Sequence, residues 1–209
     1  MYISQSDKEL VDILSSKVRC LSLQQIADTF FRGHCSNARR RIRALKQMRL
    51  FVEHSIVTRV LRGIDGPLFR YREGDLEPNA DQLSRYLKTR WKRLRTSTTS
   101  IFTLHPHAAR TTGCSLKGRL PHPLQAGHEL ALSSVYLLLR KTAPQLAENW
   151  RGEDAFLGAN PRGQKPDAVI TSPVGGVITA IELGGFYSAK RLRQFHRHCC
   201  KQKVNYEIW

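Results

Sequence analysis

Two carboxylates stand beside two apolar runs near the end of the chain, and together they could hold a metal ion. Asp167 directly precedes the run AVIT, and Glu182 directly follows the run VITAI. The residues between the runs, SPVGG, are a hairpin signal, so we expect two paired strands whose ends bring the carboxylates together. Carboxylate oxygens are the ligands that Mg²⁺ prefers, and a water held by such a metal can attack phosphorus. Asp167 and Glu182 are therefore candidate catalytic residues and candidate ligands for Mg²⁺ or Mn²⁺.

The elements that must position these carboxylates follow a regular order over residues 128–209. HELALSSVYLLLRK predicts a helix, and NWRGEDAFLG predicts a short strand around residues 153–157. The two strands of the hairpin follow, then the helix SAKRLRQFHRHCCKQK and the strand VNYEIW. This α-β-β-β-α-β order resembles the core of the PD-(D/E)XK restriction-endonuclease-like fold, in which helices pack on a mixed sheet. The resemblance implies a further acidic metal ligand on the first helix, where this chain has Glu129.

That fold carries a lysine two residues after the glutamate, where this chain has Gly184. The lysine helps to position and activate the attacking water and offsets developing negative charge. Lys165 lies two residues before Asp167 and would point to the same face of an extended chain, so it is the candidate catalytic replacement. The alternatives on the following helix are Lys190, Arg193 and Gln194. Because the defining lysine is missing, we expect a non-catalytic nuclease-like domain, with active cleavage as the alternative.

The amino-terminal part predicts a different kind of unit. DKELVDILSS, LSLQQIADTFF and SNARRRIRALKQM each have apolar residues at helical spacing. Ser22 is the predicted N-cap of the second helix, with Gln25 completing a capping box. The runs FVEHSIVTRVL and LFRYR then predict two strands on either side of a turn at 63–67. This is the element order of a winged helix-turn-helix, whose third helix enters the major groove and whose wing is the turn.

The third helix carries the residue types that read DNA. Ile42, Leu45 and Met48 form its apolar stripe, which leaves polar and basic residues on its other faces. Asparagine can pair with adenine and arginine with guanine in a bidentate way, so Asn37, Arg40 and Arg41 are candidates to contact bases. Several other residues suit phosphate contacts, including the wing arginines. The full set of candidate DNA-binding residues is Ser36, Asn37, Arg39, Arg40, Arg41, Arg43, Lys46, Arg59 and Arg62, with Arg70 and Arg72 as further wing arginines.

Composition supports an anionic partner. The 209 residues include 34 Lys and Arg against 17 Asp and Glu, a formal net charge of +17. Nucleic acid is favoured over membrane, because no basic helix shows the bulky apolar face of an interfacial anchor and the run LALSSVYLLL is too short to span a bilayer. Five scattered cysteines without a CxxC pair indicate a reducing compartment. We therefore expect a cytoplasmic protein that binds double-stranded DNA, needs no cofactor to do so, and has no membrane partner.

The polar segment EGDLEPNA suggests a boundary between these parts. The expected fold class is α+β, with a winged helix-turn-helix over residues 1–73 and the nuclease-like α/β domain over 128–209. Residues 80–127 are expected to hold an amphipathic connector helix, ADQLSRYLKTRWKRLR, followed by an irregular segment that includes TSIFTLH as a short strand.

Several short motifs give the chain a resemblance that covers most of its length. They are GPLFRYREGD, LKTRW, GHELALSSVYLLL, WRGEDAFL, KPDAVI, IELGGFYSAKRLRQFH and NYEIW. With them the chain resembles the replication-relaxation family of plasmids and other mobile elements, in which a winged helix precedes a nuclease-like domain. The resemblance implies action on DNA in bacterial plasmid replication, mobilisation or transcription control. IELGG departs from the family's acidic pair as well as from the lysine pattern, so a degenerate nuclease-like domain is expected.

Two alternative functions and the oligomeric state stay open from the sequence. The first is an enzyme, a DNA endonuclease or nickase that depends on Mg²⁺ or Mn²⁺. The second is an accessory factor that recruits a relaxase or a replication protein. The third concerns assembly: winged-helix proteins often form homodimers on near-palindromic sites, but no heptad or exposed apolar stripe marks an interface in this chain.

Overall fold

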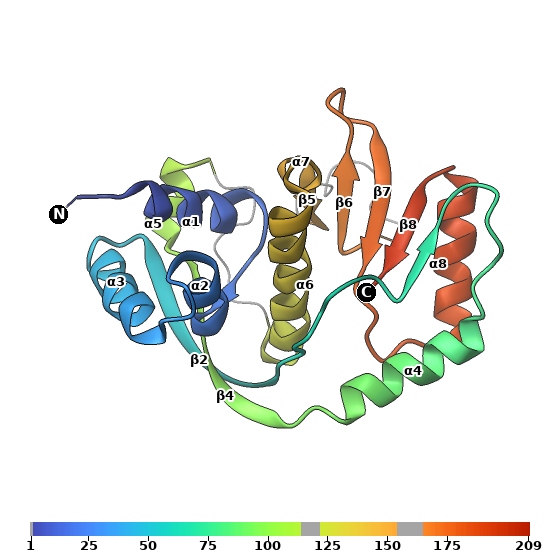
Figure 1. The fold of residues 1–209 in the computed structure, drawn as a ribbon, viewed down its shortest axis with the longest axis horizontal. Coiled ribbons are helices and arrows are strands. Elements are labelled where there is room, and N and C mark those ends of the chain that lie inside the picture. The colour runs from blue at the N-terminus through green and yellow to red at the C-terminus, as the bar shows by residue number, and fades with distance from the viewer. Residues whose placement is uncertain (1, 114–121, 154–164) are drawn as a thin grey trace. The chain divides into compact units, whose positions relative to one another are not determined.

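The computed structural model describes residues 2–113, 122–153 and 165–209 and shows an α+β protein (Figure 1). The chain forms two compact units, each built from two separate stretches. Unit 1 contains Met1–Val60 and Thr96–Leu137, and unit 2 contains Leu61–Arg95 and Leu138–Trp209. This division differs from the limits expected from the sequence, because the segment of residues 61–95 is inserted between two strands of unit 1. None of the described helices is long and apolar enough to cross a bilayer.

Unit 1 begins with three helices that lie where the sequence predicts them. They are α1 (Gln5–Ser16), α2 (Leu23–Phe30) and α3 (Cys35–Gln47). The predicted capping box of α2 is present: the Gln25 backbone N–H donates to Ser22 Oγ, and the Ser22 N–H donates to the Gln25 side chain. A second capping box, between Ser4 and Asp7, begins α1. Reciprocal bonds of this kind satisfy N–H groups that the first turn leaves unpaired.

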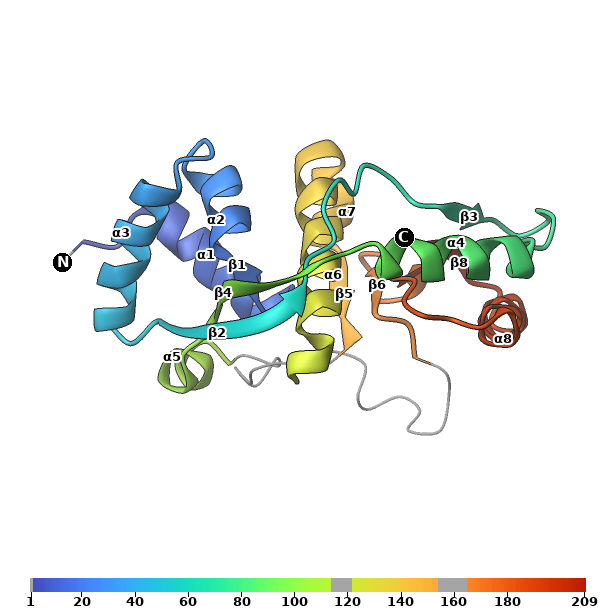
Figure 2. The same ribbon diagram turned by 90° about the horizontal axis from the view of Figure 1, so that it is seen from below.

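The sheet of unit 1 corrects the predicted wing. Its order is β1 (Leu21–Ser22), β4 (Thr96–Leu104) and β2 (Phe51–Arg59), all antiparallel. Figure 2 shows β2 and β4 side by side over their length, from Phe51 opposite Leu104 to Arg59 opposite Thr96. The prediction that β2 forms a hairpin with the run LFRYR was wrong, since β3 (Phe69–Tyr71) pairs with β8 of unit 2. Sequence proximity favoured the wrong partner, because the right one follows the inserted segment.

Two more helices complete unit 1. The helix α5 (Pro106–Thr111) follows β4, and α6 (Pro123–Thr142) begins in unit 1. The first half of α6 packs on the sheet through a cluster of buried residues, Cys20, Ile56, Ile101, Ala126 and Leu130. Gly127 allows this approach: a Cβ atom there would lie 2.2 Å from the backbone oxygen of Arg59. Any larger residue would push the helix away from β2.

Unit 2 is built on a five-stranded mixed sheet. Its order is β3, β8 (Asn205–Ile208), β7 (Val177–Glu182), β6 (Ala168–Thr171) and β5 (Trp150–Gly152), and only β7 and β8 are parallel. The helix α7 (Pro144–Glu148) precedes β5, and α8 (Ala189–Lys201) connects β7 to β8. The elements predicted from residue 128 onward are therefore present in the predicted order, with α7 added. The first strand begins earlier than expected, and residues 154–157 of that prediction lie outside the described residues.

The predicted connector helix is part of the core of unit 2. It forms α4 (Ala80–Lys92), which packs beside α8. Leu87 is fully buried against residues of α8 and β8, and the Trp91 indole donates a buried hydrogen bond of 2.6 Å to the Gly184 backbone oxygen. The amphipathic pattern of this segment therefore predicted the helix correctly, and its apolar face covers the end of β7.

Candidate functional sites

The helix α3 presents a polar and basic face to solvent. Ala38, Ile42 and Leu45 are buried, as the spacing of the apolar stripe predicts, while Met48 is half-buried. The side chains away from this stripe are exposed: Ser36, Asn37, Arg39, Arg40, Arg43 and Gln47. Because residues three and four apart share a helix face, Ser36, Arg40 and Arg43 lie on the side opposite the core. Five of the predicted DNA-binding residues thus remain accessible on one helix.

Arg41 differs from its neighbours, because its guanidinium is engaged inside unit 1. Its Nε donates to Asp7 Oδ1 at 2.9 Å, and its Nη2 donates to Asp7 Oδ2 and, at 2.8 Å, to the Tyr2 backbone oxygen. Asp7 is only 3% exposed. Its burial tends to raise its pKa, but hydrogen bonds from Arg41 and Ser4 bring the pKa below its ordinary value. Arg41 therefore holds α3 against α1, instead of standing ready to read a base.

Lys46 is likewise engaged, with a carboxylate of β2. Its ammonium donates to Glu53 Oε2, and this hydrogen bond is the main reason why the pKa of Glu53 lies below its ordinary value. The ion pair joins the end of α3 to the sheet, and its partial exposure keeps its energetic worth small. Of the five cations predicted on this helix, the three that remain exposed are Arg39, Arg40 and Arg43.

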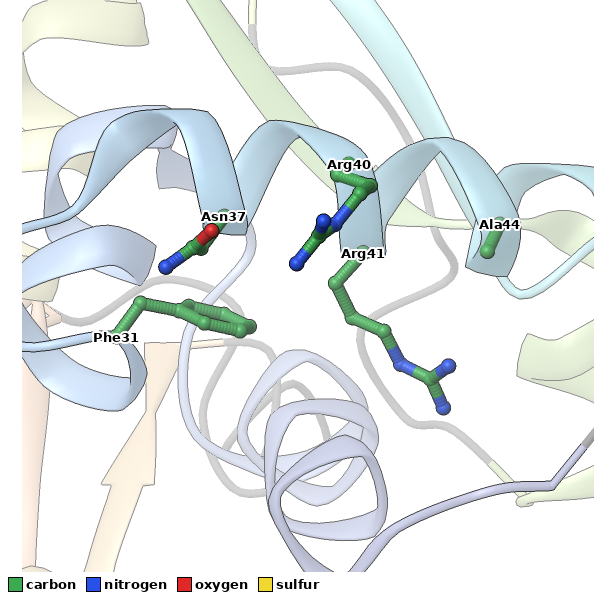
Figure 3. A pocket seen from close by; sticks show the side chains of 5 residues that line it. All are labelled: Phe31, Asn37, Arg40, Arg41 and Ala44. Carbon is green, nitrogen blue, oxygen red and sulfur yellow. The ribbon is translucent and has the colours of Figure 1, made fainter.

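A pocket of about 430 Å³ lies beside the accessible part of α3. It is lined by Phe31, Asn37, Arg40, Arg41 and Ala44. In Figure 3 the side chains of Asn37 and Arg40 point to the side of α3 where the Phe31 ring lies, whereas Arg41 extends away from the ring. Sequence reasoning missed Phe31, although the second phenylalanine of DTFF falls just beyond the end of α2 and was a signal for a partly exposed ring.

The arginines predicted for the wing are divided between the two units. Arg59 ends β2 in unit 1 and is half-buried, and Arg62 is exposed in the stretch that belongs to unit 2. Arg70 lies on β3, where its Nε donates to Glu207 Oε1 at 3.0 Å. The turn at 63–67 therefore does not join two strands of unit 1.

The predicted carboxylate pair comes together in unit 2. Asp167 directly precedes β6 and Glu182 ends β7, and these strands pair with Ala168 opposite Ile181. Asp167 Oδ2 accepts a hydrogen bond of 2.7 Å from the Leu183 backbone N–H. The hairpin SPVGG produces this pairing, as the sequence predicts, because antiparallel neighbours bring the start of one strand to the end of the next.

Glu182 is the more buried of the two carboxyl groups. It is 1% exposed, and its Oε2 has no hydrogen-bond partner among the described residues. Burial and the neighbouring charge of Asp167 raise the pKa of Glu182 to about 8, although Tyr187 and Arg191 act in the opposite direction. A buried carboxylate oxygen without a partner is costly, so this atom indicates a place where a further proton or cation would be stabilised.

The cation that lies at this pair is Arg191, which sequence reasoning missed. Its Nη2 is 3.3 Å from Glu182 Oε1 and 3.1 Å from the Tyr187 hydroxyl, and its Cζ lies 3.9 Å from the centre of the Tyr187 ring. The predicted replacement, Lys165, is half-buried. Lys190 is exposed, and Arg193 pairs with Asp81. The signal for Arg191 was its place in the first turn of α8, capped by Ser188, directly after the glutamate strand.

Packing explains why position 184 is a glycine. A Cβ atom at this position would lie 2.3 Å from Leu87 Cδ2, so α4 occupies the space that a lysine side chain would need. The Gly184 backbone is also held, with its N–H donating to the Trp209 oxygen at 2.9 Å. The missing lysine is therefore coupled to the packing of α4 on the end of β7.

Glu129 belongs to unit 1, whereas Asp167 and Glu182 belong to unit 2. It is 7% exposed, and its Oε1 accepts a hydrogen bond of 2.6 Å from Arg19. Across residues 2–113, 122–153 and 165–209, no group of three or more His, Cys, Asp or Glu side chains could hold a metal ion. The described site thus has two acidic residues where three were expected.

Comparison with protein-family models, with curated proteins and with solved structures gives no match for this chain.

Proposed function

We propose that this chain is a double-stranded DNA-binding protein of a bacterial mobile element, acting in replication, mobilisation or transcription control. Unit 1 would bind DNA as a winged helix, with α3 in the major groove, and unit 2 would be a nuclease-like domain of degenerate PD-(D/E)XK type. The observation that carries the proposal is the exposed face of α3, where Asn37, Arg40 and Arg43 stand clear of a buried stripe. Asn37 and Arg40 lie in the first half of α3, where such donors are suited to base edges.

The rest of unit 1 supports this orientation of α3. The ion pairs of Arg41 with Asp7 and of Lys46 with Glu53 hold the helix on both sides. The antiparallel pair β2 and β4 takes the place of a wing, and its far end is where the chain leaves unit 1 at Val60 and returns at Thr96. A helix that is held by its flanks and exposed on its outer face can enter a groove without rearrangement.

Arg40 gives the sharpest test of this function. A preferred site would first be enriched from random duplexes by repeated binding. We expect Arg40→Ala to weaken binding to that site by about 1–3 kcal/mol, which is about 5- to 150-fold, because one bidentate contact to guanine is lost. Fluorescence anisotropy with labelled duplexes measures the change.

The matched control is Arg110→Ala, which removes an exposed arginine from α5 of the same unit. The control should bind nearly as tightly as the unchanged protein. An equal loss for Arg40→Ala on the enriched site and on scrambled DNA would assign Arg40 to phosphate contact. Failure of the unchanged protein to bind any duplex at low salt would refute the proposed function.

A second candidate function is metal-dependent cleavage of DNA. The observation that favours it is the buried, unpartnered Oε2 of Glu182 beside Asp167. Hard divalent cations bind such oxygens and keep several waters, so two carboxylates fit Mg²⁺ or Mn²⁺. Asp167 and Glu182 would hold the ion, which would supply an activated water for attack on phosphorus. The element order α6, β5, β6, β7, α8 and β8 is consistent with a nuclease-like scaffold.

Supercoiled plasmid tests this second function. If it holds, nicking appears with Mg²⁺ or Mn²⁺ and disappears both in Asp167→Ala and with chelator. Asp81→Ala is the control, since Asp81 is an exposed carboxylate of the same unit that pairs with Arg193. Nicking that persists in Asp167→Ala would arise elsewhere, and the absence of nicking at all metal concentrations would leave unit 2 without this activity.

A further inference from the structure

The guanidinium of Arg191 lies against the carboxylate that a divalent cation would use. Its Nη2 reaches Glu182 Oε1 at 3.3 Å, while the side chain of Glu182 is 1% exposed and that of Arg191 is 49% exposed. The cation thus approaches a buried carboxyl group from the solvent side. Two other arginines of unit 2 pair with different carboxylates, Arg193 with Asp81 and Arg70 with Glu207.

Tyr187 holds Arg191 in this position. The Tyr187 hydroxyl accepts a hydrogen bond of 3.1 Å from the same Nη2 atom, and the guanidinium lies over the tyrosine ring at 3.9 Å. A planar guanidinium is well suited to such stacking and keeps its charge at any physiological pH. These contacts with Tyr187 place the guanidinium beside Glu182.

A guanidinium and a divalent cation cannot both occupy this carboxylate at low cost. Two positive centres within a few ångström repel each other strongly wherever water is largely excluded. A lysine at position 184 would add a second cation at this end of the sheet. Leu87 fills the space that such a side chain would need, and the residue there is glycine. Within the described part of the chain, Arg191 is the cation that forms an ion pair with Glu182.

We propose that Arg191 is the resident counter-ion of Glu182 and competes with divalent cations for this carboxylate. The inference rests on the carboxylate pair of the second candidate function, but it concerns binding and holds whether or not DNA is cleaved. In this role Arg191 keeps the affinity of the carboxylate for divalent cations low.

Metal binding measures this competition directly. Titration of the full chain with Mn²⁺, followed by the electron paramagnetic resonance signal of the free ion, should show weak binding by the unchanged protein. Arg191→Gln, which keeps hydrogen-bonding capacity and removes the charge, should bind Mn²⁺ about tenfold or more tightly, a typical size for coupling between two bound groups.

Four further variants make the result specific. Arg191→Lys retains a positive charge but loses the planar stacking on Tyr187, so it should bind Mn²⁺ more weakly than Arg191→Gln, whereas Arg191→Ala should bind as tightly as Arg191→Gln. Arg193→Gln, on the same helix but paired with Asp81, should change nothing. The double variant Asp167→Asn with Arg191→Gln should lose the added affinity. A general disturbance of the fold would not raise metal affinity.

Three results would overturn the inference. One is an unchanged Mn²⁺ affinity in both Arg191→Gln and Arg191→Ala, with thermal unfolding showing that both are folded. Another is added affinity that survives Asp167→Asn. The last is unchanged protein that already binds Mn²⁺ as tightly as Arg191→Gln. If Arg191→Gln gains Mn²⁺ binding but does not nick plasmid, the competition by Arg191 is supported and metal-dependent cleavage is not. Failure of the inference can therefore be told from failure of the second candidate function.

Discussion

Duplex binding by this protein is expected to weaken about 10³- to 10⁴-fold between 50 and 200 mM salt. The chain carries a formal net charge of +17, and three exposed arginines of α3 face away from the core of unit 1. Neutralising about 5–8 phosphates releases their counterions and gives a log–log slope of about −5 to −7. The effect is large because most of the binding free energy would come from this release.

Affinity measured across a salt series gives the slope. Arg43→Ala should make the slope shallower by about 1 if Arg43 contacts a phosphate, and should weaken binding to all sequences alike. Arg110→Ala again serves as the control on an exposed arginine of unit 1. A nearly flat slope for the unchanged protein would contradict binding through a basic surface.

Asp7→Ala is expected to lower the free energy of unfolding of unit 1 by about 3 kcal/mol, since removal of one partner leaves the other charge of a buried pair uncompensated. Asp7 is 3% exposed and accepts hydrogen bonds from Arg41 and from Ser4 at the start of α1. Arg41 keeps about a quarter of its side chain exposed, so water partly compensates its charge and the loss stays at the lower end of the range for buried pairs.

Denaturant unfolding measures this loss, with Asp12→Ala as the control on an exposed acidic residue of the same helix. The pH dependence supplies a second readout. Because the folded-state pKa of Asp7 is depressed, its contribution is present above the unfolded pKa of about 3.9 and is lost as the pH falls through the folded value. The variant should therefore show a flatter loss of stability in acid. A stability equal to that of Asp12→Ala would contradict the role of this ion pair.

Local patterns predicted the elements that carry both sites. The three helices of unit 1, the capping box of Ser22 with Gln25, and the hairpin that joins β6 to β7 follow from spacing and turn chemistry within a few residues. The meeting of Asp167 with Glu182 was predictable for the same reason, because a short hairpin determines which strand ends are neighbours.

The predictions that the structure corrected depend on contacts between segments that are far apart in the sequence. The partner of β2 is β4, which follows an inserted segment of residues 61–95, and the run LFRYR belongs to another sheet. The engagement of Arg41 depends on Asp7, which is 34 positions away in the chain. Spacing along α3 made Arg40 and Arg41 equivalent, although only Arg40 is exposed.

The amino-acid sequence by itself determined the first three helices, the capping box of Ser22 with Gln25, the hairpin at the carboxylates and the basic excess, because each depends on residue type and on neighbours a few positions apart. Only the tertiary structure decided which cations are accessible, where Glu129 pairs, and that Arg191 and Leu87 occupy the surroundings of Glu182 and Gly184. Packing brings together side chains from separate elements, and burial then sets the electrostatic cost of each charge, so neither is contained in a local pattern.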